Sequence, residues 1–264
     1  MKFSITTNKK IYFACDLHLM MAPDELSRRR ELDFVQWLDT IKNDAAAIFL
    51  LGDVFDFWFE YRYVVPRGFV RLLGKLAELS DSGIPVHFFT GNHDQWIRNY
   101  LPYELNINIY HKPTEFELNG KCFLIGHGHE ISLKNFTERV IHFSFSNRLL
   151  RILFAMIHPF WGVSFAKNWS KSHRRRYGSV LPFEGIEKEL IYRYVRKKLA
   201  EKHYDFFVFG HRHLAMDIRA GENSRYINLG EWMEKQTYAV FDGKDMCLYS
   251  AKGEMDFLKI DDVS

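Results

Sequence analysis

The sequence predicts an α/β fold, with a mostly parallel sheet and a second, mixed or antiparallel sheet packed against it. Strand-like and helix-like segments alternate through residues 11–90, which is typical of βαβ units. Beyond residue 106 short strand-like segments follow one another instead. The 264 residues, 47% of them hydrophobic, can bury a large core. The length allows one large α/β domain with an insertion or two small domains, and we expect a single domain over residues 1–264.

Apolar runs and amphipathic segments alternate in the first part of the chain. The runs at 11–15, 45–51 and 85–90 predict buried strands. Residues 28–43 and 68–79 have apolar side chains at helical spacing, which predicts a helix between each pair of strands.

The later part of the chain predicts a hairpin and further strands. Asn119-Gly120 separates strand-like residues 114–118 from 121–125, as in a tight hairpin. Residues 186–202 have helical periodicity and precede an apolar run at 205–209. The remaining expected strands are short and alternating, and we expect them to form the second sheet: 216–219, 226–229, 238–241 and 246–250.

Residues 131–183 form a basic, aromatic insertion that we expect to be helical. The segment holds nine lysines and arginines against one acid, Glu138, although the whole chain has a net charge of only +3. One interpretation is a helical hairpin that packs its apolar side on the body and exposes its charges. The other is a lid, with apolar side chains for acyl chains and basic ones for phosphates or an anionic membrane surface.

The cysteines and the apolar segments indicate the cellular compartment in which the protein is expected. Cys15, Cys122 and Cys247 are odd in number and lie in apolar surroundings, which favours reduced thiols in a cytosolic protein. The first residues lack the apolar core of a signal peptide. The most apolar window, between Arg151 and Lys167, is shorter than the roughly 20 residues that span a bilayer. We expect no transmembrane helix.

Five predicted strands end in residue types that bind metal ions. Considered by itself, Asp53 could equally be a turn or helix-capping residue. Six of the twelve histidines fall at these five strand ends, and so many are hard to explain as histidines with a purely structural role. Glycines before Asp53, Asn92, His127 and His211 allow sharp turns and close approach to an ion. The candidate residues are Asp16, His18, Asp53, Asn92, His93, His127, His211 and His213.

The ligand types narrow the choice of metal. Carboxylates, imidazoles and an amide oxygen without a thiolate suit Mn²⁺, Fe²⁺ or Zn²⁺. The residues are too many for one tetrahedral zinc ion. Two ions that share a carboxylate, as in two-metal phosphatases and nucleases, fit the set better.

These motifs resemble those of the calcineurin-like metallophosphoesterases. The matching patterns are Asp-x-His at 16–18, Gly-Asp-x-x-Asp at 52–56, Gly-Asn-His-Asp at 91–94 and Gly-His-x-His at 210–213, with His127 as a further histidine. The resemblance implies a β-sandwich of two mixed sheets flanked by helices, a helical lid insertion and hydrolysis of a phosphoester or pyrophosphate by two metal ions.

The resemblance also implies a role for each residue. Asp16, His18 and His213 would bind one ion. Asn92, His127 and His211 would bind the other, and Asp53 would bridge both. His93 would donate a proton or stabilise the transition state, oriented by Asp94, and Asp56 would support the ligands without binding metal.

The layout is most similar to the UDP-2,3-diacylglucosamine diphosphatases of lipid A synthesis. This resemblance implies Mn²⁺ and cleavage of the UDP-linked glycolipid to UMP and 2,3-diacylglucosamine 1-phosphate. It implies a cytoplasmic enzyme attached peripherally to the inner leaflet, with no nucleic acid or obligatory protein partner. Substrate contacts would come from Asn92 and from the lid residues Ser170, Lys171 and Arg174. Phe55, Phe57 and Trp58 are expected to separate the metal centre from the lid.

Two positions depart from that family's pattern. The best-known branch has arginine in place of His93, which allows a different branch or substrate. His129 replaces the usual aspartate, which leaves open whether His127 or His129 faces the metal. The alternatives are a metallophosphoesterase for another nucleotide, phosphodiester or nucleic acid, and a scaffold without catalysis, against which the intact ligand set argues.

Overall fold

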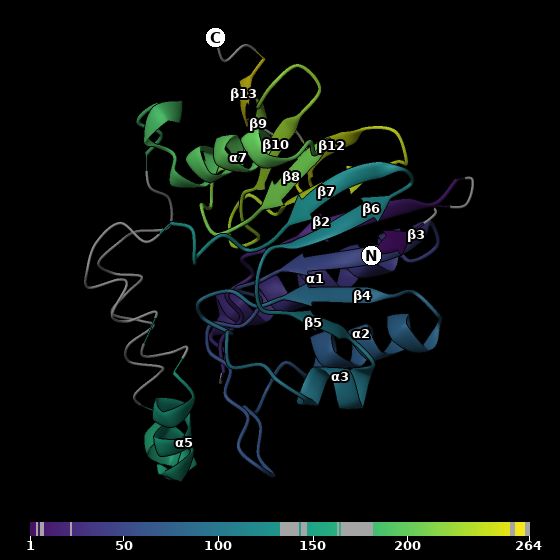
Figure 1. Ribbon diagram of the computed structural model, residues 1–264. Coiled ribbons are helices and arrows are strands. Elements are labelled where there is room, and N and C mark those ends of the chain that lie inside the picture. The colour runs from purple at the N-terminus through teal and green to yellow at the C-terminus, as the bar shows by residue number, and fades with distance from the viewer. Residues whose placement is uncertain are drawn as a thin grey trace.

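Two mixed β-sheets pack face to face and form the centre of the molecule (Figure 1). The computed structural model describes residues 1–3, 5, 8–21, 23–132, 143, 147–162, 164, 182–253 and 257–261. In spatial order, the six-stranded sheet consists of β12 (Met246–Ser250), β11 (Thr237–Phe241), β2 (Lys10–Ala14), β3 (Ala45–Leu51), β4 (Val86–Phe89) and β5 (Asn108–Tyr110). The seven-stranded sheet consists of β1 (Lys2–Phe3), β6 (Thr114–Leu118), β7 (Lys121–Ile125), β8 (Phe206–Phe209), β10 (Arg225–Leu229), β9 (Ala215–Arg219) and β13 (Leu258–Ile260). The predicted fold class is confirmed.

The strand directions place several carboxyl ends at the same edge. β2, β3, β4 and β5 are parallel in the first sheet, and β7, β8 and β10 are parallel in the second. The prediction that the late strands form the second sheet is wrong for β11 and β12, which extend the first sheet beside β2. Their alternating pattern indicates one buried face but does not specify which sheet they join.

Helices cover the outer faces of the sandwich. α1 (Glu25–Ile41), α2 (Val70–Asp81) and α3 (Tyr100–Leu105) pack on the six-stranded sheet, and α7 (Leu190–Glu201) packs on the other. The Asp24 carboxylate caps α1 by accepting from the Ser27 amide at 2.8 Å. Phe34 and Trp37 of α1 pack against Trp232, with ring centroids 4.8 and 4.9 Å away.

Four short elements were not predicted, because none of them is long enough to show a clear period. These are β1, α3, β5 and β13. The helix expected over 186–202 begins as a 3₁₀ turn, η1 (Ile186–Lys188), and becomes α-helical only after Glu189.

The described part of the 131–183 insertion includes α5 (Arg148–Met156), which begins after an Asn147 cap. Its Phe154 ring packs against Phe59 and Trp96, at centroid distances of 4.7 and 5.0 Å. Figure 1 shows α5 standing away from the two sheets. Phe154 is therefore the described contact through which this helix meets the aromatic cluster of the body.

The expected aromatic wall is only partly present. Phe57 lies 6.3 Å from the ring of Phe154. Phe55 and Trp58 instead pack inward on Phe69, at 4.7 and 6.2 Å.

Among the described residues, no helix is long and apolar enough to cross a bilayer.

A buried histidine in the core predicts an acid-sensitive fold. Burial lowers the pKa of His87 from 6.5 to about 4, while its Nδ1 lies 3.0 Å from the Tyr110 hydroxyl. His87 binds a proton more readily in the unfolded chain than in the folded one, so protonation favours unfolding. The contribution of neutral, buried His87 to the stability of the fold is therefore full above pH 6.5 and is lost as the pH falls towards 4. The loss should be about 3 kcal/mol.

Urea titrations at several pH values can measure this effect. His87→Leu should have a flatter stability profile between pH 6.5 and 4 than the wild type. Substitution of the exposed His203 by leucine is the control. Equal slopes for His87→Leu and the wild type would contradict the prediction.

Candidate metal centre

Residues from both sheets meet where the carboxyl ends of their parallel strands face each other. Asp16 and Asp53 each lie two residues beyond β2 and β3, and His127 lies two residues beyond β7. The His211 amide donates to Asp16 Oδ2 at 3.0 Å, and this hydrogen bond joins the two edges. The predicted strand-end residues therefore form one site across the sandwich.

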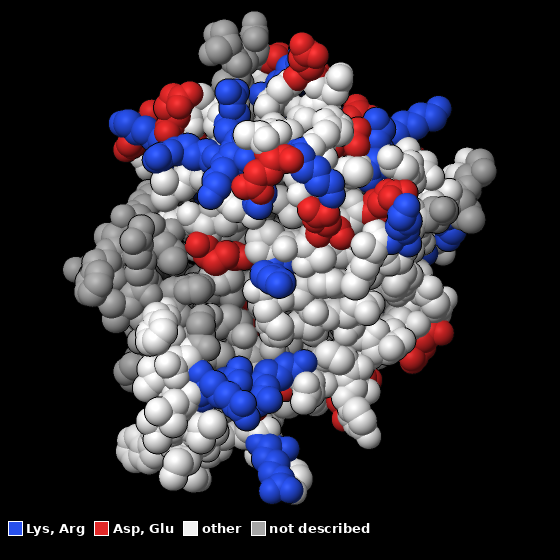
Figure 2. Space-filling view, in the orientation of Figure 1, with Lys and Arg blue, Asp and Glu red and all other residues white. Residues whose placement is uncertain are grey.

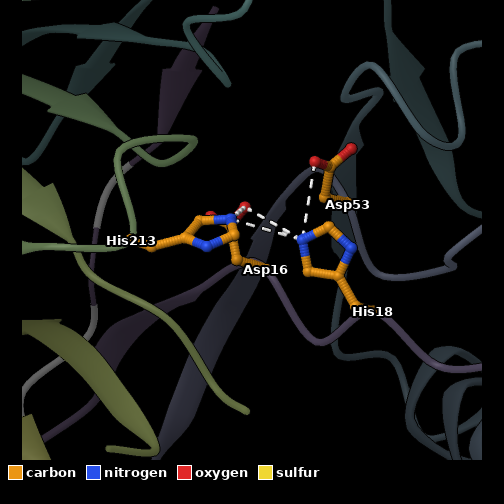
Figure 3. Close-up of side chains that lie close together, drawn as sticks. All are labelled: Asp16, His18, Asp53 and His213. Carbon is orange, nitrogen blue, oxygen red and sulfur yellow. Dashed lines mark hydrogen bonds and ion pairs between the residues drawn. The ribbon is translucent and has the colours of Figure 1, made fainter. Parts of the chain in front are cut away.

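The first cluster contains Asp16, His18, Asp53 and His213 (Figure 3). His213 Nε2 lies 3.0 Å from Asp16 Oδ1 and 3.3 Å from His18 Nε2. His18 Nε2 also lies 3.7 Å from one carboxylate oxygen of both Asp16 and Asp53. The four side chains thus present oxygen and nitrogen atoms to a common point, as ligands of one cation do.

Asp56 lies behind His18 and does not enter this cluster. Its Oδ1 is 3.5 Å from His18 Nδ1, on the opposite side of the ring from the nitrogen that faces Asp16. Its carbonyl oxygen lies 3.0 Å from His93 Nδ1. A carboxylate beside an imidazole can fix the direction of the ring, so this position suits the supporting role expected for Asp56, although Asp56, His18 and His93 also form a third group of possible ligands.

The second cluster contains Asp53, His127 and His211. His127 Nδ1 donates to the Leu51 carbonyl oxygen at 2.6 Å, which directs Nε2 towards Asp53 Oδ2 at 3.5 Å. The rings of His127 and His211 are 5.1 Å apart. Asp53 Oδ2 therefore faces both clusters, as a shared ligand would, while Oδ1 accepts from the His93 amide at 2.8 Å.

His129 lies beside the second cluster rather than in it. Its ring centroid is 5.4 Å from that of His127, and its Nδ1 is 3.2 Å from Glu130 Oε2. Burial raises the pKa of Glu130 above its usual value. This geometry favours His127, not His129, as the histidine that faces Asp53.

Asp94 does not occupy the expected place beside the His93 ring. Its Oδ2 accepts from the amides of Val54 and Phe55 at 2.9 and 3.3 Å, and its Oδ1 accepts from the Gly91 amide at 2.7 Å. The prediction that Asp94 orients His93 is therefore corrected. Asp94 joins the turn after β3 to the turn after β4, and the Asp56 carbonyl is the group that meets His93 Nδ1.

Backbone strain is concentrated in this centre. Ten non-glycine residues of the described chain have positive φ, and five of them belong to the two clusters. Such conformations cost about 1–3 kcal/mol each and persist where the surroundings enforce them. The five are Asp16, His18, Asp53, His211 and His213, with φ of 53, 46, 49, 66 and 54°.

Opposite charges compensate one another inside the centre. Burial opposes ionisation of Asp16 and Asp53, but histidines around them hold the pKa of each carboxyl below its usual range. Burial also opposes charge on His18 and His127, yet the carboxylates raise the pKa of each imidazole to about 10. Burial and the nearby His127 lower the pKa of His211 to about 3. The two carboxylates thus require positive charge, which protons or cations can supply.

The donor set fits divalent cations. Asn92 Oδ1 and His127 Nε2 are buried and make no hydrogen bond with the described residues. Asn92 also lies between Gly91 and His93, both of which contact the Asp53 turn. A cation would satisfy these orphaned atoms without a thiolate ligand.

A supporting segment near the C-terminus was not predicted. The Asn228 side chain donates to the Gly210 carbonyl at 2.8 Å, and the Trp232 amide donates to the Asp16 carbonyl at 3.1 Å. The polar Asn228 within the otherwise largely apolar predicted strand 226–229 was the available signal. The predicted substrate contacts Ser170, Lys171 and Arg174 lie outside the described residues.

Carboxylates and imidazoles gathered at the facing edges of two mixed sheets define a metal-dependent hydrolase. The chain belongs to the calcineurin-like phosphoesterase family, whose model matches residues 9–215.

Several known proteins are similar to this chain. UDP-2,3-diacylglucosamine hydrolase of Porphyromonas gingivalis is 40% identical over 257 residues, which cover 91% of this chain and 97% of that protein. A protein of the same name from Histophilus somni is 25% identical over 85% of this chain and 92% of its own length. The solved phosphoesterase Yfce of E. coli has a TM-score of 0.44, with 14% identity and 90% of each chain covered.

Proposed function

We propose that this enzyme hydrolyses the pyrophosphate bond of UDP-2,3-diacylglucosamine to UMP and 2,3-diacylglucosamine 1-phosphate. The observation that carries this proposal is the 40% identity to a hydrolase of that name over 91% of the chain. The paired clusters around Asp53 supply the site that such a reaction requires.

The ligand assignments follow the two clusters. Asp16, His18 and His213 would hold one ion, and Asn92, His127 and His211 the other, with Asp53 between them. When bound, two divalent cations activate water at neutral pH and neutralise phosphoryl oxygens. Mn²⁺ is the ion we propose, on the family resemblance. Reconstitution with Mn²⁺, Fe²⁺ or Zn²⁺ separately would test that choice.

His93 is the proposed proton donor. Because the Asp56 carbonyl can only accept, His93 Nδ1 carries the proton of that hydrogen bond. Nε2 is then the nitrogen that exchanges a proton with the leaving oxygen. Burial lowers the pKa of His93, so the anionic phosphates of a bound substrate would have to promote protonation of Nε2.

Substrate competition tests the proposed reaction. With Mn²⁺ present, UMP should be released from the diacylated UDP-sugar faster than any product from UDP-N-acetylglucosamine, nucleotides or single-stranded DNA. Faster cleavage of DNA or of a free nucleotide would favour the alternative phosphoesterase function. Failure to cleave any of these substrates would favour a scaffold.

We further propose that the enzyme acts in the cytoplasm and binds the inner membrane peripherally through the α5 region. Leu149, Met156 and Trp161 have 63, 78 and 66% of their surface exposed. Burial and the charges of Arg98 and Arg148 lower the pKa of Arg151, so positive charge from two other arginines acts on this residue of α5. Figure 2 shows Lys and Arg side chains gathered beside the α5 region. Exposed apolar side chains beside basic ones suit an anionic bilayer surface.

Vesicle binding tests this surface. Leu153 is a further exposed apolar residue of α5. The double variant Leu153→Ser and Trp161→Ser should bind phosphatidylglycerol vesicles at least about tenfold more weakly, because each apolar side chain contributes about 1.5–3 kcal/mol when fully buried. Tyr103→Ser, which alters an exposed aromatic residue of α3, is the control. Equal vesicle affinity for the double variant and the wild type would contradict the membrane proposal.

A further inference from the structure

Arg212 lies between two proposed ligands, yet its side chain makes a bidentate ion pair outside the metal centre. Arg212 Nε donates to both carboxylate oxygens of Glu189, at 3.2 and 3.0 Å, and Nη2 donates to Oε1 at 2.8 Å. Only 13% of the Arg212 side chain and 7% of the Glu189 side chain are exposed. Such a fork of charge-assisted hydrogen bonds fixes orientation as well as distance.

Glu189 is held on a rigid support. Its amide donates to the Ile186 carbonyl at 3.1 Å, and its own carbonyl accepts from the Arg193 amide at 3.0 Å, where α7 begins. A carboxylate is favoured at a helix N-terminus. α7 itself is anchored by buried Ile191 and Val195 in the core beneath it. The Arg212 side chain is therefore attached to a fixed point.

The turn that carries Arg212 needs such an attachment. His211 and His213 both have left-handed backbone conformations, with φ of 66 and 54°. The start of the turn is held by hydrogen bonds from the Gly210 amide to the His127 carbonyl and from the His211 amide to Asp16 Oδ2, both 3.0 Å. Arg212 adds a further attachment, in the direction of α7.

The same guanidinium group reaches the end of the 131–183 insertion. Arg212 Nη2 donates to the Pro182 carbonyl at 2.9 Å. The Arg212 side chain thus links the ligand-bearing turn, from which it extends, to the start of α7 and to the chain that returns from the insertion.

We propose that Arg212 and Glu189 are a positioning pair for the metal centre. They hold the His211–His213 turn in the conformation that presents both imidazoles to metal, and they join it to the end of the insertion. The proposal rests on the assignment of these histidines as ligands but not on the identity of the phosphoester. Removal of either partner should weaken metal binding before any substrate is present.

Calorimetric titration of the full chain with Mn²⁺ alone tests the pair. Arg212→Gln and Glu189→Gln should each weaken Mn²⁺ binding about 10- to 100-fold, as loss of a ligand's supporting contact does. The double variant should be little worse than either single one, because both remove the same interaction. Arg212→Lys keeps the charge without the fork and should recover part of the affinity.

The Arg225–Asp217 ion pair is a matched control. Arg225 Nε donates to Asp217 Oδ1 at 3.0 Å, and these side chains are 27 and 9% exposed. Arg225→Gln should lower the melting temperature but leave Mn²⁺ affinity unchanged. If Arg212→Gln behaves in the same way, the pair is merely structural and the proposal fails. If Arg212→Gln does not fold, the Mn²⁺ affinity of Arg212→Lys decides, and an affinity equal to that of the wild type overturns the proposal.

Discussion

Asp53→Asn should reduce kcat/KM by at least about a thousandfold and remove at least one bound metal ion. The amide retains an oxygen that can accept from the His93 amide, so the turn is preserved. It removes the charge at Oδ2, which lies 3.7 Å from His18 Nε2 and 3.5 Å from His127 Nε2. Loss of metal catalysis removes several kcal/mol of transition-state stabilisation, and each 1.4 kcal/mol is a factor of ten in rate.

Metal content by mass spectrometry and steady-state kinetics together measure this outcome. Asp205→Asn is the control, since that carboxylate accepts from the Cys122 amide at 2.8 Å just before β8, whereas the metal centre follows the other end of that strand. The control should keep both its ions and its turnover. A variant Asp53→Asn that binds two ions and keeps a tenth of the activity would show that Asp53 is not the shared ligand.

The candidate ligands could be predicted because their signal is local. Asp53 and His127 each follow an apolar run that ends in glycine, and parallel strands bring such ends to one edge. The choice between His127 and His129 could not be made from the sequence, because both follow β7. The Leu51 carbonyl, which accepts from His127 Nδ1 at 2.6 Å, directs that ring towards Asp53.

The contacts of Asp94 could not be predicted for a different reason. Its partners are the backbone amides of Val54, Phe55 and Gly91, and every non-proline residue carries an amide. No side-chain pattern identifies such a partner forty positions away. The same limit applies to β11 and β12, whose alternating residues would bury one face in either sheet.

Gly91→Ala should reduce kcat/KM at least about a hundredfold, although it adds only one methyl group. A Cβ at this position would lie 2.6 Å from the Asp53 backbone nitrogen and in severe contact with Asp53 Oδ1. Asp53 Oδ1 also accepts a hydrogen bond from the His93 amide, and the Gly91 amide donates one to Asp94. The turn after β4 must therefore move away from Asp53, and a small misplacement at a reacting centre can cost a factor of about a hundred.

Gly74→Ala separates this effect from the general cost of replacing glycine. Gly74 lies within α2, and a Cβ there would meet nothing within 4 Å. Alanine at that position should stabilise the protein by roughly 0.5–1 kcal/mol without changing turnover or metal affinity. Because Gly91→Ala crowds the Asp53 carboxylate itself, its Mn²⁺ affinity should fall together with its activity. Full Mn²⁺ affinity in Gly91→Ala would contradict this prediction. It would mean that the turns after β3 and β4 can separate without displacing the Asp53 carboxylate.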